Sequence, residues 1–265
     1  MSTRIAPRRD SRRLPSACLG ASWLVVLAMG CGGGEPPKDP KVELNNQVRM
    51  AQGFLRSGRT AQARTAIEAA IEIDPKNAGL HNFYGQVLFL MGRFDDSEAA
   101  YDTALTLDPY LTDAHNNRGA LYAEIGRPAE AEREYMEALE DRSFPTPQKV
   151  YFNLGMLYAA QGRNEDALVQ LRKAVEIERD YYQAHYELAG VLDRLGKLEE
   201  AASEYEVALP GYRTSGEYHY RLGFVYFRLG NEARAMPELQ RVLDLAPGSE
   251  SAVQATELLK VIGSS

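Results

Sequence analysis

The sequence of 265 residues predicts an all-α fold, a right-handed α-solenoid of six helix pairs that ends in one capping helix. The first observation behind this prediction is a small residue that recurs every 34 residues, with one spacing of 36. We call these the marker positions, and they are Ala51, Gly85, Gly119, Gly155, Ala189 and Gly223. The second observation is a glycine seven residues after each marker. A glycine just past a helix end closes that helix in the left-handed conformation, so each period should contain two helices.

Two further columns indicate the type of repeat. Twelve residues after each marker stands Ala or Ser, and a bulky Ile, Leu or Tyr follows four residues later. Positions four apart share one helical face, so the small residue admits a close neighbour and the bulky one packs beside it. A 34-residue period of paired antiparallel helices is typical of tetratricopeptide repeats, which this sequence resembles.

Residues 1–30 have the pattern of a signal peptide. Five Arg and one Asp fall within residues 1–13, and an apolar run follows at residues 17–29. The run is too short to span a membrane as a helix of the mature protein. It leads into LAMGC at residues 27–31, which resembles a bacterial lipobox, so we expect Cys31 to be acylated. The alternative is an ordinary signal peptide cut near residue 28 or 30, which would leave Cys31 as an unpaired thiol in an oxidising compartment.

Cleavage before Cys31 would change the charge and the cysteine content. Cys18 would be lost, so the mature chain would contain no disulfide and no cluster of Cys ligands for a metal. The mature chain would carry 25 basic and 36 acidic residues, a net charge of −11 compared with −7 for the whole sequence. This charge argues against binding to nucleic acid and against electrostatic docking on anionic lipid. Acyl chains would then hold the protein on a membrane through residues 31–40, a flexible Gly- and Pro-rich tether.

Residues 41–265 are predicted to form the repeat domain, with the capping helix at 249–262. The spacing between markers is two residues longer between the third and fourth repeats, and the segment 140–147 at this junction contains two prolines. Pro210 and Gly211 predict an early end for the second helix of the fifth repeat. The apolar side of the capping helix is predicted to consist of Val253, Leu258, Leu259 and Ile262.

No pattern in the sequence indicates an enzyme, a cofactor or a metal site. The four histidines, His81, His115, His185 and His219, each lie four residues before a marker in a different repeat. A stack of repeats separates equivalent positions by one layer each, so we interpret these histidines as packing residues. The chain lacks a Ser-His-Asp order, a Gly-rich phosphate loop and an HExxH motif.

One face of the first helices is predicted to bind a protein partner. Residues three before and one, four and five after each marker lie about 100° around the helix from it. Similarity to other tetratricopeptide proteins implies that this face lines a concave groove. The residues assigned to the groove are Phe89, Leu90, Asn116, Phe152, Met156, Tyr186, Tyr220, Phe224 and Phe227. Such an aromatic groove favours an apolar or amphipathic segment of a partner. The alternative is that single residues of this set contact the core of the next repeat.

A second use of such a groove is to hold the terminal carboxylate of a chaperone. That use needs Lys and Arg around paired Asn residues. Asn82, Asn117 and Lys149 match this pattern in part, but Asn153 stands where an Arg is required.

The chain from residue 31 to 265 resembles the outer-membrane pilotins of type IV pilus secretins, the PilF/PilW/Tgl group. Besides the lipobox, the resemblance rests on the third-to-fourth junction, with Asn116-Asn117-x-Gly119, Ala138-Leu139-x-Asp141, Phe144-Pro145, Val150 and Asn153-Leu154-Gly155. It implies a lipid-anchored outer-membrane protein that faces the periplasm and binds the pilus secretin, promoting its multimerisation or its localisation. The alternatives are an adaptor for outer-membrane barrel assembly or for a cell-wall synthase, and a regulatory subunit of an envelope peptidase.

Overall fold

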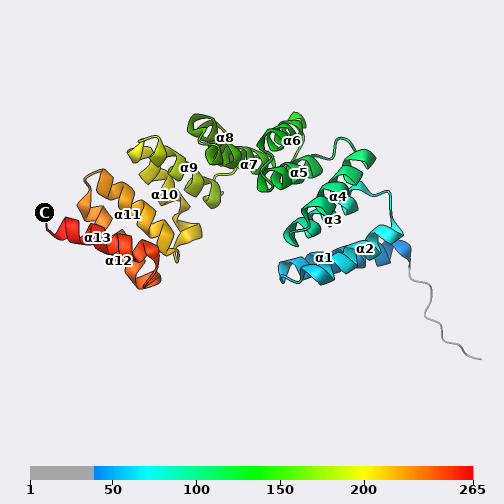
Figure 1. Ribbon diagram of the computed structural model, residues 1–265, viewed down its shortest axis with the longest axis horizontal. Coiled ribbons are helices and arrows are strands. Elements are labelled where there is room, and N and C mark those ends of the chain that lie inside the picture. The colour runs from blue at the N-terminus through cyan, green and yellow to red at the C-terminus, as the bar shows by residue number, and fades with distance from the viewer. Residues whose placement is uncertain (1–38, 265) are drawn as a thin grey trace, which may run out of the picture. The chain divides into compact units, whose positions relative to one another are not determined.

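The computed structural model describes residues 39–264, which belong to one compact unit of the chain (Figure 1). Residues 1–38 and residue 265 lie outside the described residues. The predicted signal peptide, Cys31 and all but the last two residues of the predicted tether fall outside that range, so these assignments stay predictions.

The described residues contain thirteen α-helices and no strand, and consecutive helices pack in pairs. In chain order the helices are α1 (Pro40–Arg56), α2 (Thr60–Ile73), α3 (Ala78–Leu90), α4 (Phe94–Leu107), α5 (Thr112–Glu124), α6 (Pro128–Glu140), α7 (Pro147–Ala160), α8 (Asn164–Ile177), α9 (Tyr182–Arg194), α10 (Leu198–Tyr212), α11 (Gly216–Arg228), α12 (Glu232–Leu245) and α13 (Glu250–Gly263). The pairs run from α1–α2 to α11–α12, and α13 packs against both helices of the last pair (Figure 1). The predicted solenoid of six repeats with a capping helix is confirmed.

The turn inside each pair is built on the predicted glycine. The six glycines that follow the markers by seven residues all have φ between 70° and 75°, where a side chain would be strained. The residue after each glycine donates its N–H to a carbonyl five residues earlier, as Arg59 does to Phe54 at 2.9 Å. This contact satisfies a carbonyl at the end of the first helix and reverses the chain into the second helix.

The marker positions are small because a bulky residue of the second helix lies directly on them. A Cβ added to Gly85 would come within 2.6 Å of the Tyr101 ring, and one added to Gly119 within 2.7 Å of the Tyr135 ring. Both tyrosines are buried. The two helices of a pair therefore approach more closely than any larger marker residue would allow.

Neighbouring repeats share a polar contact that the sequence analysis missed. The Arg127 guanidinium lies 4.2 Å from the centre of the Tyr122 ring, and both side chains donate to Glu98 of the preceding repeat, at 2.9 and 3.0 Å. Two further junctions use the same contact, with Tyr158, Arg163 and Glu132 in one and Tyr226, Arg234 and Glu206 in the other. A cation over an aromatic face that also binds a carboxylate fixes one repeat against the next.

The end of α10 differs from the prediction. The helix continues through Pro210 and Gly211 to Tyr212, so the early end predicted there is wrong. The Tyr212 ring stacks on Tyr186, with centroids 4.6 Å apart, and on Tyr218, with centroids 5.8 Å apart. This packing offsets the backbone hydrogen bond that a proline cannot donate.

The capping helix lies where it was predicted, with one error in its apolar side. Ser249 caps α13 by accepting a hydrogen bond from the N–H of Ala252 at 3.1 Å. Val253 is 60% exposed and was wrongly assigned to the apolar side. The side that meets the array consists of Ala252, Ala255, Leu258, Leu259 and Ile262.

α13 occupies the place of the first helix of a seventh repeat. Its residue at the marker position, 34 residues after Gly223, is Glu257, and that side chain is 72% exposed. The charged side chain stands where the six repeats have Gly or Ala, so no second helix could pack there as closely as in the repeats.

The hydrophobic core is divided along the chain. One continuous cluster of buried side chains extends from Tyr122 in α5 to Ile262 in α13. The first pair and α3 share a separate cluster that extends from Ala51 to Val87. A small third cluster, formed by Ala104, Leu105 and Ala114, lies between α4 and α5.

Candidate protein-binding groove

The first helices form the concave side of the array. Contacts between neighbouring repeats join α3 to α5, α5 to α7, α7 to α9, and α11 to α13. No two second helices of neighbouring repeats contact each other to the same extent. An array of helix pairs curves toward the side on which helices of neighbouring repeats lie closer together, so the first helices line its inner face.

The predicted groove residues divide into a buried group and an accessible group. Phe152 is only 8% exposed, and its ring packs 5.2 Å from that of Tyr181, so its assignment to an open groove is wrong. Met156, Tyr186, Tyr220 and Phe227 are half-buried and pack against the main core cluster. Half-buried Phe89 contacts Phe94 in the turn of its own pair, whereas Leu90 is 55% exposed.

Asparagine amides connect the first helices of the second, third and fourth repeats. Asn117 donates to the Oδ1 of Asn82 at 3.0 Å, and Asn153 donates to the Oδ1 of Asn116 at 3.0 Å. The predicted groove residue Asn116 is half-buried and forms part of this series. The inner face is therefore polar and amide-lined in its middle part.

An aromatic hollow lies at the other end of the inner face, between α9, α11 and α13. It has a volume of about 390 Å³, and Tyr220 and Phe224 are its aromatic walls, whereas its other six lining residues, Arg221 and Glu250 among them, are polar or charged. The rings of Tyr220 and Phe224 stack with centroids 6.0 Å apart. The Arg228 guanidinium lies 5.8 Å from the centre of the Phe224 ring. This hollow combines two of the predicted groove residues with charges of both signs, which suits an amphipathic segment of a protein.

Charged groups beside the aromatic hollow are partly removed from water. Arg228 forms an ion pair with Asp193 of the preceding repeat. Burial raises the pKa of the Glu187 carboxyl, and the nearby Arg221 and Arg194 lower it in part. A partner that brings a cation to this part of the groove would stabilise the ionised form of Glu187.

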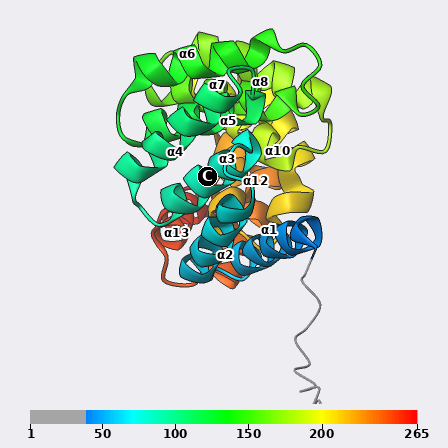
Figure 2. The same cartoon turned by 90° about the vertical axis from the view of Figure 1, so that its right-hand side faces the viewer.

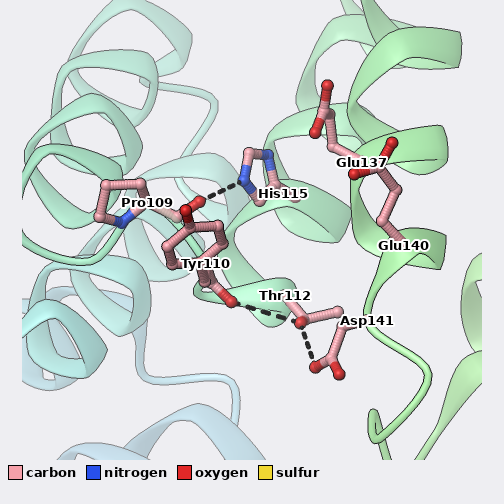
Figure 3. A pocket seen from close by; sticks show the side chains of 7 residues that line it. All are labelled: Pro109, Tyr110, Thr112, His115, Glu137, Glu140 and Asp141. Atoms are coloured by element: carbon pink, nitrogen blue, oxygen red, sulfur yellow. Dashed lines mark hydrogen bonds between the residues drawn. The ribbon is translucent and has the colours of Figure 1, made fainter.

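A second cavity, of about 460 Å³, opens on the third repeat (Figure 3). The imidazole of His115 contacts the carbonyl of Pro109 at 3.0 Å and the Glu134 carboxylate at 2.8 Å. The hydrogen bond to Glu134 raises the pKa of His115. Thr112 donates to Asp141 at 2.8 Å, which joins the start of α5 to the turn after α6 (Figure 3). These contacts hold the start of α5 against α6 and against the turn that follows α6.

The histidine column has a structural role. His185 and His219 each contact a Glu nineteen residues later and a backbone carbonyl six residues earlier, as His115 does. His81 contacts only the carbonyl of Pro75, because Ala100 occupies the position of the Glu. Within residues 39–264, no three His, Cys, Asp or Glu side chains are placed to hold a metal ion.

Comparison with known proteins gives the family. The paired helices, the glycine turns and the concave inner face define a helical-repeat scaffold of the kind that binds other proteins. Models described as tetratricopeptide repeat match residues 48–112 and 152–216, 110–180, and 216–249, so together they span most of the chain. The chain belongs to the tetratricopeptide-repeat family.

Solved structures with the same fold include two from type IV pilus systems. The structure of PilF from Pseudomonas aeruginosa has a TM-score of 0.75 at 22% identity, covering 82% of this chain and 98% of PilF. PilW, described as a widely conserved type IV pilus biogenesis factor, has a TM-score of 0.72 at 24% identity, covering 80% and 98%. YrrB, described as having an unusual peptide-binding site, has a TM-score of 0.59 at 23% identity, covering 72% and 98%. At these identities the matches establish the fold.

A sequence relative covers a smaller part of the chain. An uncharacterised protein of Haemophilus influenzae is 31% identical over 78 residues, which are 29% of this chain and 44% of that protein. The match thus spans less than half of the relative's length. Among the helices of residues 39–264, none combines the length and the apolar character needed to cross a bilayer.

Proposed function

We propose that this protein is a lipid-anchored scaffold of the outer membrane, facing the periplasm, that binds the type IV pilus secretin. In this role it promotes the multimerisation of the secretin or its placement in the membrane. The observation that carries the proposal is the match to PilF and PilW, because the shared fold accounts for 98% of each of those chains. The lipobox-like run LAMGC at residues 27–31 supports the anchor.

The inner face has the chemistry that this role requires. A secretin subunit must cross the periplasm before it assembles, and until then its membrane-destined apolar surface is exposed. The rings of Tyr220 and Phe224 would cover apolar side chains of such a surface, and the polar and charged residues that make up the rest of the hollow would orient the bound segment. Assembly of the secretin would bury the same surface and release the scaffold.

Assembly of the secretin in cells tests the proposal. Deleting the gene should reduce the secretin multimer while the monomer persists, and the native chain should restore the multimer. The variant with Tyr220→Ala and Phe224→Ala should restore it poorly, because truncated interface aromatics typically cost about 2 kcal/mol or more of binding. Val169→Ala, at a 50% exposed position on the second helix α8, is the matched control. A normal amount of multimer in the deletion strain would contradict the proposal.

Two further measurements separate the parts of the proposal. Mass spectrometry of the mature N-terminus should find acylated Cys31, and an unmodified Cys31 or a different first residue would refute the anchor. Capture from membranes with the native chain should recover the secretin. Recovery of a barrel-assembly protein, a cell-wall synthase or an envelope peptidase in its place would favour that partner.

A further inference from the structure

The charge of this protein is unevenly distributed along the array. From Pro40 to Thr65 the chain has five basic residues, Lys41, Arg49, Arg56, Arg59 and Arg64, and one acidic residue, Glu43. From Ala66 to the end it has 19 basic and 33 acidic residues. The net charge of −11 therefore conceals a positively charged first pair, and an argument from net charge does not apply to this part of the molecule.

The basic side chains of the first pair are available to an external anion. Lys41, Arg49, Arg56 and Arg59 are all exposed, and none forms an ion pair with a described carboxylate. Arg49 donates to Asn46, a neutral partner, and Arg59 donates to Ser57. Only Arg64 approaches a carboxylate, that of Glu68 at 3.8 Å.

An apolar groove lies next to one of these cations, because the Arg59 guanidinium lies 4.7 Å from the centre of the Phe54 ring and Phe54 lines the groove. It runs between α1 and α2, has a volume of about 480 Å³, and is lined by Met50, Phe54, Ala61, Thr65 and Ala69 among others. Met50 is 47% exposed and Val42, in the first turn of α1, is 55% exposed. This surface is the open end of the array, because α1 and α2 have a neighbouring repeat on one side only (Figures 1 and 2). The opposite end is covered by α13.

We propose that this end of the array, which we call the N-terminal end face, docks on an anionic lipid surface. The basic side chains would meet the headgroups, while Val42, Met50 and the apolar groove would receive the upper part of the acyl region. The position of the chain outside the structure favours lipid over a protein occupant. Cys31 lies nine residues before Pro40, and nine extended residues span at most roughly 30 Å, so the predicted anchor would hold this face near the bilayer.

The proposed surface would give the anchor a second contact with the membrane. Lipid anchors bind more stably when a basic patch accompanies them. It would also turn one end of the array toward the bilayer and leave the aromatic hollow, on the inner face of the last repeats, open to a partner. The inference goes beyond secretin binding and does not depend on the identity of the partner.

Binding to vesicles tests the proposal without acylation and without any secretin. The chain from residue 31 with Cys31→Ser contains the whole compact unit. It should sediment with vesicles of phosphatidylethanolamine and phosphatidylglycerol, sediment less at high salt, and stay in solution with phosphatidylcholine vesicles. Arg49→Glu together with Arg56→Glu should lower the partition coefficient roughly tenfold or more. Met50→Ser should lower it several-fold.

The matched control reverses two exposed charges elsewhere, with Arg213→Glu and Arg241→Glu, and should bind as the unsubstituted chain does. Circular dichroism checks that each variant keeps its helices. Equal binding of the Arg49→Glu, Arg56→Glu variant and the control, or no preference for anionic vesicles, would overturn the proposal. A dimer in solution that Met50→Ser abolishes would also overturn it, since this face would then bind a second copy of the chain.

Discussion

The first two repeats and the last four follow the same period but are held together differently. From the third repeat to α13, buried side chains form one continuous apolar cluster. The first pair and α3 have a small cluster of their own, and Ala104, Leu105 and Ala114, with half-buried Leu111, form another between α4 and α5. Polar side chains hold that junction, with Asn117 bound to Asn82 and with Arg127 and Tyr122 bound to Glu98. The last four repeats should therefore unfold as one unit, and the first two should open at a lower free energy.

The largest effect is expected inside the continuous cluster. Phe152→Ala should lower the free energy of unfolding by about 3–5 kcal/mol, because it removes a buried ring that packs on Tyr181. Phe224→Ala, at a half-buried position on the inner face, should cost clearly less. Chemical denaturation of the two variants measures the difference. Equal costs would show that the two phenylalanines are buried alike.

A smaller effect is expected inside the first two repeats. Gly85→Ala should destabilise the fold by about 1–3 kcal/mol, because the new Cβ would meet the Tyr101 ring. Gly53→Ala in α1 has nothing within 4 Å of the new atom and should stabilise its helix by up to about 1 kcal/mol. Thermal unfolding with a probe in the first pair distinguishes these outcomes. Destabilisation by both substitutions would contradict the view that only the marker position is crowded.

A smaller difference is expected between two junctions, that of the second and third repeats and that of the third and fourth. Glu98→Ala removes the acceptor shared by Tyr122 and Arg127 and should cost about 1 kcal/mol. Glu132→Ala removes the same acceptor at the next junction, where apolar packing is continuous, so it should cost less. Hydrogen exchange should show faster opening of α1–α4 in the Glu98→Ala variant than in the Glu132→Ala variant. The reverse order would mean that apolar continuity does not decide how the junctions are held.

The smallest effect is a dependence on pH at the start of the third repeat. Because its hydrogen bond to Glu134 raises the pKa of His115, the folded state holds the imidazolium more tightly than the unfolded chain does. This stability is present below the unfolded pKa of about 6.5 and is lost as the pH rises through the folded value. The native chain should lose more stability from pH 6 to pH 9 than His115→Gln does. Glu134→Gln, which removes the carboxylate partner of His115, should lose the same part of the pH dependence.

The repeat architecture could be predicted from the sequence because period and glycine spacing fix it locally. A glycine seven residues after a small residue determines where one helix ends, whatever the rest of the array contains. The exposure of a groove residue does not follow from the period in this way. Phe152 and Tyr220 occupy the same position of their repeats, yet Phe152 is buried because Tyr181 packs on it.

Two other features were not predicted, for different reasons. α10 continues past Pro210 because Tyr212 stacks on Tyr186 and Tyr218, residues of the neighbouring first helices. The positive charge of the N-terminal end face was overlooked because the net charge of the whole chain averages the basic first pair with the acidic remainder. Counting charges separately for each helix pair would have revealed it from the sequence.

Glu257 has a consequence for how copies of this protein meet. A helical-repeat array with two open ends can add molecules head to tail, and a contact that does not close on itself yields filaments. Here the first pair offers an open apolar groove, but the other end presents a carboxylate at the position where close packing would need Gly or Ala. The longer Glu257 side chain, which pairs with Lys260 at 3.9 Å, keeps a helix of another molecule from packing there as closely as Gly or Ala would allow. One acidic side chain thus works against end-to-end polymerisation of the array.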